Sequence, residues 1–206
     1  MPSLINCTIN RLDDILDNTL VRRNVPAAHL VYGIPLTINA SMHVVMLSLQ
    51  KLLKLGHPMI GSTFSNCMLE AIRGQGKEIY WRDNFQCPTE EQYDHMILQK
   101  TGHMFKLLVS LMSLFSTNKT DYSHLATLLG CIGRMVKYRH KSNILRQRTT
   151  DISLKKQCVL LLEELGSLQY TKNKILQLER TIRIEIENFG GNPELSSLLD
   201  ELASNI

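Results

Sequence analysis

Apolar residues recur every three or four positions along almost the whole chain, which is the spacing of amphipathic helices. Hardly any segment shows the strict alternation typical of a β-strand. The pattern predicts helices over 4–19, 59–78, 121–136, 151–165, 168–188 and 193–204. A further helix is expected to begin at Asn39 or Ser41 and to end before Gly56, and a long one to extend from about 88 to 115. The sequence therefore predicts one all-α domain over residues 1–206.

Two of these helices have apolar faces that we expect to point inward. The first face comprises Met42, Val45, Met46, Leu49, Leu52 and Leu53, and the second Phe64, Met68, Leu69 and Ile72. The segments 22–26 and 33–35 contain proline or glycine and are expected to be loops. Gly102 falls inside a predicted helix, where glycine is costly unless another segment approaches closely.

The composition is that of an ordinary globular protein, with 23 basic and 19 acidic side chains among 206 residues. This small excess does not indicate nucleic-acid binding, which usually concentrates more positive charge on one face. Residues 24–50 carry no charge and could span a bilayer, but their prolines and polar side chains favour a buried loop and core helix. Five scattered cysteines without a C-x-x-C pair, and no secretory signal, predict a cytoplasmic protein without a transmembrane segment.

Three aspartates near the start of the chain form the most informative pattern. Asp13 and Asp17 are four residues apart, so a helix places both carboxylates on one face, where they repel each other. Mg²⁺ prefers oxygen ligands and often bridges carboxylates to substrate phosphates. Arg22 and Arg23 follow closely and could hold the same phosphates through forked hydrogen bonds. The alternative from spacing alone is a solvated acidic turn beside a basic one.

Two further motifs are weaker. Lys100 and Thr101 precede Gly102, a combination that can contact phosphate, although the glycine-rich cradle of a P-loop is missing. The alternative is a surface lysine before a helix kink. Arg82 and Asp83 follow the only tryptophan, and we expect them to pair with each other at a helix end rather than to take part in chemistry.

Several of these motifs, taken in order, resemble those of trans-prenyltransferases. The segments Asp13–Asn18, Arg22–Arg23 and Tyr32–Pro35 are similar to the first aspartate-rich motif of that family. More specific segments resemble animal geranylgeranyl diphosphate synthases: 74–84, 87–91, 98–102, 143–149 and 190–195. The resemblance covers about 12–130 and 143–200, which is most of the chain.

The resemblance implies an all-α isoprenoid-synthase helical bundle and Mg²⁺-dependent prenyl transfer. In that family isopentenyl diphosphate is joined to an allylic diphosphate, and the metal and basic residues stabilise the departing diphosphate. By position, the metal ligands would be Asp13, Asp14 and Asp17. Arg22, Lys100 and Thr101 would contact the allylic diphosphate, and Arg23 the isopentenyl diphosphate. The resemblance also implies a homo-oligomer, or a mixed oligomer with an intact synthase subunit.

The chain departs from the family where a second aspartate-rich motif is expected. No Asp or Glu occurs between Tyr122 and Thr150, and residues 131–142 form a junction that replaces the motif. This junction contains the basic residues Arg134, Lys137 and Arg139, which would repel Mg²⁺. The isopentenyl diphosphate site that precedes the first motif in the family also has no counterpart in the residues before Asp13.

These departures leave three hypotheses open. The chain is a geranylgeranyl-diphosphate-synthase-like prenyltransferase of weak or no activity, because a misaligned second substrate reacts poorly. Alternatively it is a non-catalytic protein that associates with an intact synthase subunit. The third hypothesis is a chain that does not fold stably, because missing helices would expose apolar faces of their neighbours.

Overall fold

The computed structural model describes residues 2–118, 120–138, 157, 160, 163–164 and 166–204. Its long elements are helical, which confirms the all-α prediction. The first half contains α1 (Pro2–Leu16), α2 (Ala28–Tyr32), α3 (Ile34–Leu53) and α4 (Ile60–Asp83). The second half contains α5 (Glu90–Ile97), the π-helical turn η1 (Leu98–Gly102), α6 (His103–Phe115), α7 (Ser123–Tyr138), α10 (Ser167–Asn188) and α11 (Pro193–Ser204).

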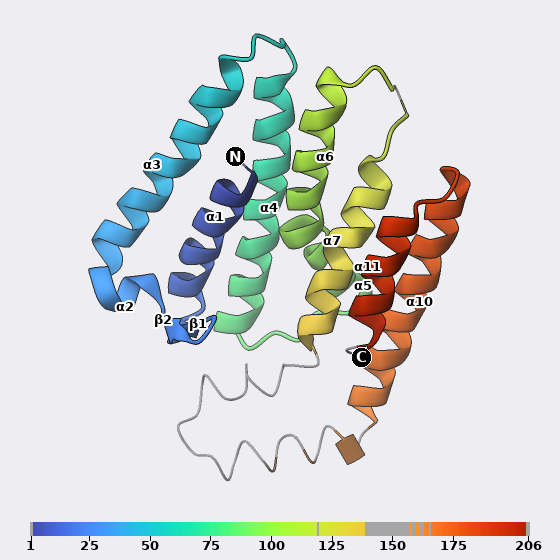
Figure 1. The fold of residues 1–206 in the computed structure, drawn as a ribbon. Helices are drawn as coiled ribbons and strands as arrows, with labels where there is room; N and C mark the ends of the chain where they lie inside the picture. Colours follow the sequence, from blue (N-terminus) through green and yellow to red (C-terminus); the bar gives the residue numbers. More distant parts are fainter. Residues whose placement is uncertain are drawn as a thin grey trace.

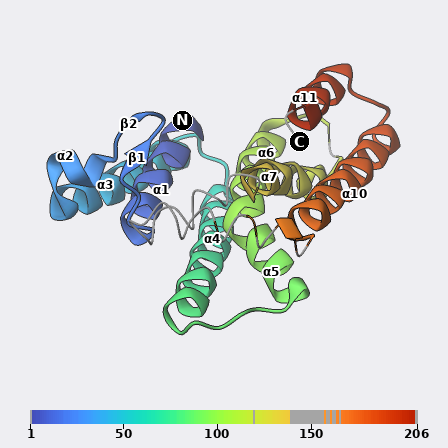
Figure 2. The same cartoon turned by 90° about the horizontal axis from the view of Figure 1, so that it is seen from below.

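The helices form two groups on either side of α4. Seen from below, α1, α2 and α3 lie together on one side, whereas α6, α7, α10 and α11 lie on the other (Figure 2). Within the groups α1 packs on α3, α4 on α6, and α7 on α10. The lower ends of α1 and α4 in Figure 1 meet beside a short hairpin, and this is where the candidate site lies.

Three apolar clusters form the core, and the first of them joins the two groups. The largest joins α3, α4 and α6 and contains Val45, Leu52, Ile60, Phe64, Cys67, Ala71, Met104, Leu107 and Leu111. Ile9 of α1 packs against it, so α1 is anchored to the same core. A second cluster joins α7, α10 and α11 through Leu125, Ile182, Ile186 and Leu199. The third, Met96, Ile97 and Cys131, fixes α5 and η1 against α7.

The helix that we expected to begin at Asn39 or Ser41 begins earlier, at Ile34. Pro35 occupies its first turn, where the missing N–H has no partner to lose and the fixed φ suits the helix. The hydroxyl of Thr37 donates to the carbonyl of Gly33 at 2.8 Å and strengthens this start. The prediction of a loop over 33–35 is therefore wrong, because Pro35 lies in the first turn of a helix, where proline does not interrupt the helix.

The apolar faces were predicted only in part. Val45, Leu52 and Phe64 are buried as expected, but Met46 and Ile72 are 55% and 62% exposed. Met42, Leu53 and Leu69 are exposed as well. The buried face of α3 consists instead of Thr37, Ser41, Val45, Ser48 and Leu52, because its small side chains admit α1 at close range.

Residues 24–50 are accordingly not the buried loop and core helix that their prolines and polar side chains favoured. Their apolar side chains are largely exposed along α2 and α3. Among the residues that the structure describes, no helix is long and apolar enough to cross a membrane.

The predicted loop at 22–26 contains the two strands of the described chain. β1 (Val21–Arg22) and β2 (Val25–Pro26) pair antiparallel across the turn at Arg23 and Asn24. Both turn residues have positive φ, 51° and 66°, the geometry of the tight turns that suit hairpin twist. Of the remaining predictions, most of the helix over 151–165 and part of the junction at 131–142, including Arg139, lie outside the described residues.

Candidate functional site

The three aspartates lie at the carboxyl-terminal end of α1, but they do not face one way. Asp14 is 2% exposed and points toward the hairpin. Arg22 of β1 donates to it in a fork, from Nε to Oδ1 at 2.9 Å and to Oδ2 at 3.0 Å, and through Nη2. This hydrogen bond raises the pKa of Arg22 above its ordinary value. The pair therefore fastens the hairpin to α1 and leaves Asp14 with little capacity for another ligand.

Asp13 faces α4 and η1, where it meets a buried lysine. Lys100 Nζ lies 2.8 Å from Asp13 Oδ1 and 2.5 Å from Glu78 Oε2 of α4. Its side chain is 8% exposed. The ammonium group thus joins carboxylates from two helices, Asp13 of α1 and Glu78 of α4.

Asp17 lies one turn after Asp13, directly beyond the last residue of α1, and its backbone N–H donates to the carbonyl oxygen of Asp13. Arg82 of α4 approaches its Oδ1 at 3.3 Å and also donates to the carbonyl oxygen of Leu16 at 2.8 Å. Burial, and next the neighbouring carboxylate of Asp13, raise the pKa of Asp17 to about 6. The positive charges of Lys100 and Arg82 only partly oppose this effect. The site therefore carries an excess of negative charge that a further cation would relieve.

Glycines allow the lysine-bearing turn to reach this position. A Cβ on Gly74 of α4 would lie 2.5 Å from the backbone N of Lys100. A Cβ on Gly102 would lie 2.6 Å from Thr127 Cγ2 of α7. The expected close approach at Gly102 is thus present, and η1 is wedged between α4 and α7 by contacts that no larger residue permits.

The structure brings together Asp13, Asp17 and Lys100, and it places Asp14 and Arg22 beside them as a separate pair. Arg23 lies exposed at the tip of the hairpin and forms no ion pair in the described part of the chain. Thr101 follows Lys100 in the same turn, and its carbonyl oxygen approaches Gly130 of α7. The roles proposed for Arg23 and Thr101 stay predictions.

Glu78 was not among the predicted site residues, and Arg82 was expected only to pair with Asp83. The expected pair of Arg82 with Asp83 exists, at 2.7 Å, but the same guanidinium also reaches Asp17. Gly74, Glu78 and Arg82 are spaced four residues apart and share one face of α4. That spacing is the only signal in the sequence that could have linked them to the site.

The oxygen donors fit a magnesium ion held by two carboxylates. The buried Oδ1 of Asp13 forms an ion pair with Lys100 at 2.8 Å and has no hydrogen-bond partner among the described residues. Asp13 and Asp17 supply hard oxygen ligands on one helix face, and phosphate oxygens and water usually complete the octahedron. Within the described ranges no three His, Cys, Asp or Glu side chains converge as a metal cluster. Asp14 fits the metal less well, because Arg22 already occupies both of its oxygens.

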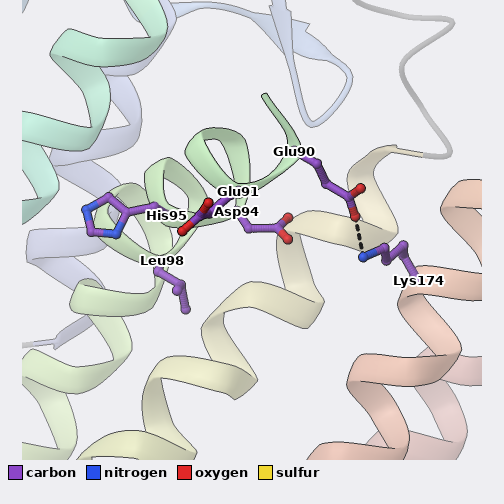
Figure 3. A pocket seen from close by; sticks show the side chains of 6 residues that line it. All are labelled: Glu90, Glu91, Asp94, His95, Leu98 and Lys174. Carbon is purple, nitrogen blue, oxygen red and sulfur yellow. Dashed lines mark ion pairs between the residues drawn. The ribbon is translucent and has the colours of Figure 1, made fainter. Parts of the chain in front are cut away.

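A separate open pocket lies between α5 and α10 (Figure 3). It is lined by Glu90, Glu91, Asp94, His95, Leu98 and Lys174, and its volume is about 560 Å³. An ion pair between Glu90 and Lys174 bridges the two helices. Burial raises the pKa of Asp94, and Lys174 opposes that shift. None of the predicted site residues lines this pocket, so it is distinct from the cluster at the end of α1.

Sequence similarity to known proteins indicates the family of this chain. Residues 9–182 match the polyprenyl synthetase family. The chain belongs to that family. A "Terpene synthase" of Matsumurasca onukii is 39% identical, over 93% of this chain and 76% of the relative. Geranylgeranyl pyrophosphate synthases of Mucor circinelloides and Dictyostelium discoideum are 30% and 32% identical, over 98% and 94% of this chain and 83% and 77% of the relatives.

These alignments are longer than the polyprenyl synthetase chain itself. They run over 229 and 251 positions in the first two relatives, whereas the chain has 206 residues. The relatives therefore contain residues inside the matched region that this chain lacks. The predicted resemblance to trans-prenyltransferases is confirmed at the level of the family, and the match to animal geranylgeranyl diphosphate synthases in particular stays a proposal.

Proposed function

We propose that the chain binds an allylic prenyl diphosphate with Mg²⁺ at the end of α1, in the manner of a geranylgeranyl diphosphate synthase. The observation that carries the proposal is the convergence of Asp13, Asp17 and Lys100, from the end of α1 and from η1, in one charged cluster. Asp13 and Asp17 would hold Mg²⁺, which would neutralise charge on the diphosphate leaving group when bound. Lys100 and Arg82, which lie beside these carboxylates, would supply N–H donors to phosphate oxygens.

Chain elongation by this protein is proposed to be weak. The support is the absence of any Asp or Glu between Tyr122 and Thr150, where a facing set of carboxylates is expected. A second support is that the relatives contain residues within the matched region that this chain lacks. A diphosphate held from one side only is poorly aligned with the second substrate, and misalignment greatly slows a reaction between two bound groups.

The test is a product assay with Mg²⁺, farnesyl diphosphate and isopentenyl diphosphate, beside a binding assay with farnesyl diphosphate and Mg²⁺ alone. We expect binding together with slow formation of geranylgeranyl diphosphate. Both should be lost in the double variant Asp13→Ala/Asp17→Ala and kept in Asp200→Ala, which removes an exposed carboxylate of α11. Absence of diphosphate binding would contradict the proposed function, and turnover at the rate of an intact relative would contradict the proposed impairment.

A second candidate function, association with another synthase subunit, is favoured by the exposed apolar face of α2 and α3. This face comprises Leu30, Val31, Tyr32, Leu36, Met42 and Met46 and contains no charged side chain. A face of this kind is typical of an interface between subunits. Because it offers no charge to complement, we propose that it pairs with the same face of a second copy of this chain. A mixed oligomer with an intact relative would use the same surface.

A further inference from the structure

One face of α4 holds the turn η1 at three points that are spaced four residues apart. Glu70, Gly74 and Glu78 follow one another along this face. The backbone of η1 rests on the middle point, because Gly74 has no Cβ to keep it away. The carboxylates of Glu70 and Glu78 each contact a side chain of η1. These two residues are about 12 Å apart along the helix axis.

Gln99 is the side chain that reaches the first of these carboxylates. It is 6% exposed, and its Nε2 donates to Glu70 Oε2 at 2.6 Å. Arg73 donates to the other oxygen of Glu70 at 2.5 Å. The bonds from Gln99 and then Arg73 lower the pKa of Glu70, so the carboxylate is ionised and the hydrogen bond from Gln99 is charge-assisted.

Lys100, the next residue, reaches in the other direction along α4. Its Nζ contacts Glu78 and Asp13, at the opposite end of the same face. Two adjacent residues of η1 are therefore fixed to two points on one helix. A rotation of η1 about its axis would move the ammonium group of Lys100 away from Asp13 and Glu78. The hydrogen bond between Gln99 and Glu70 resists that rotation.

The rest of the Gln99 side chain offers no competing anchor. Its Oε1 is buried and has no hydrogen-bond partner among the described residues. A buried amide with only one partner is costly, and such a group is commonly retained where its geometry serves a site. η1 is itself a π-helical turn, a distortion that occurs frequently at functional sites.

We propose that Gln99 and Glu70 are positioning residues that set the place of the Lys100 ammonium group for diphosphate binding. The inference rests on the proposed function, because it gives Lys100 the role of a phosphate ligand. Neither Gln99 nor Glu70 touches the ligand in this proposal. Both act through the turn that Lys100 shares with Gln99.

The test measures the affinity for farnesyl diphosphate with Mg²⁺ by calorimetry. The variant Gln99→Met keeps the volume of the side chain and removes its donor, so we expect an affinity about five- to tenfold lower, the effect of one lost hydrogen bond. Glu70→Ala should give the same loss. Glu70→Gln should keep most of the affinity, because an amide oxygen still accepts from Gln99. Thermal unfolding of each variant identifies any that does not fold.

Combination with Lys100→Ala separates positioning from a general effect on the fold. If Gln99 acts through Lys100, Gln99→Met lowers the affinity of the wild-type chain but not that of Lys100→Ala. An equal loss in both backgrounds, or no loss in the wild-type background, would overturn the proposal. If Lys100→Ala alone binds as well as the wild type, the proposed function of Lys100 fails. If it binds weakly while Gln99→Met does not, only the positioning role fails.

Discussion

At the scale of single residues, the two adjacent arginines of the hairpin provide a matched pair. Arg22 is the partner of the buried carboxylate of Asp14, whereas Arg23 is exposed at the turn. We expect Arg22→Ala to lower the free energy of unfolding by about 2–3 kcal/mol, because it leaves a buried charge without its partner. Arg23→Ala should change it by less than about 0.5 kcal/mol. Urea unfolding of both variants measures the difference, and equal effects would mean that Asp14 is solvated.

Asp17 gives a prediction for the pH dependence of stability in the metal-free protein. Its pKa of about 6 in the folded chain lies above the ordinary value of 3.8, so between these pH values the folded state holds a proton that the unfolded state has released. Stability is therefore lost as the pH rises from about 4 to 6. Since the side chain is 33% exposed, solvent reduces this loss to about 1 kcal/mol.

The variant Asp17→Asn removes the titrating charge and tests this expectation. In the presence of a chelator, we expect it to unfold a few degrees higher than the wild type at pH 7, and at the same temperature near pH 4. Asp200→Asn, at an exposed ion pair on α11, is the control that should show no such gain with rising pH. A gap that is constant across the pH range would show that the charge of Asp17 is not the cause.

At the scale of elements, the contact between α4 and η1 depends on one glycine. Gly74→Ala would place a Cβ 2.5 Å from a backbone nitrogen that cannot turn aside, so we expect a loss of about 1–3 kcal/mol in unfolding free energy. Gly76 lies in the same helix with nothing within 4 Å of its Cβ position. Gly76→Ala should therefore stabilise the chain by about 0.5–1 kcal/mol through helix propensity. Urea midpoints that shift in the same direction for both variants would contradict the close packing.

Elements were predictable from the sequence where the signal was local. The apolar period located the helices at 59–78 and 168–188, and the cost of an interior glycine indicated a close approach at Gly102. The buried faces of the helices were less predictable. Met46 and Ile72 are apolar yet exposed, because burial depends on which other helix packs against them and not on the side chain itself. The site was predictable as far as Asp13 and Asp17 share a helix face. The residues that α4 contributes to the site were not predictable, because they contact residues more than sixty positions away in the sequence. The contact between Asp17 and Arg82 is an example.

At the scale of the whole molecule, the charged site and the apolar face lie on different sides of α1. Asp13 contacts Lys100 of η1, whereas the apolar face belongs to α2 and α3. These two helices lie on one side of α1 and α4 lies on the other (Figures 1 and 2). α3 buries small side chains toward α1 and leaves its methionines outside, so it connects the two surfaces. Association through α2 and α3 would therefore leave the charged cluster at Asp13 uncovered.

This arrangement predicts that assembly can be removed without loss of diphosphate binding. Val31 and Met46 are 58% and 55% exposed on the apolar face, so glutamates at both positions would face solvent in the free subunit without disturbing its core. In a symmetric interface each glutamate would be desolvated, and the two copies would repel each other. Light scattering should show twice the subunit mass for the wild type and a single subunit for Val31→Glu/Met46→Glu. Ile184→Glu, at an exposed apolar position of α10, should keep the wild-type mass. A wild type that is already a single subunit would contradict the predicted association, and a double variant that stays associated would place the interface elsewhere. A dissociated variant that still binds farnesyl diphosphate would show that one chain is sufficient for diphosphate binding.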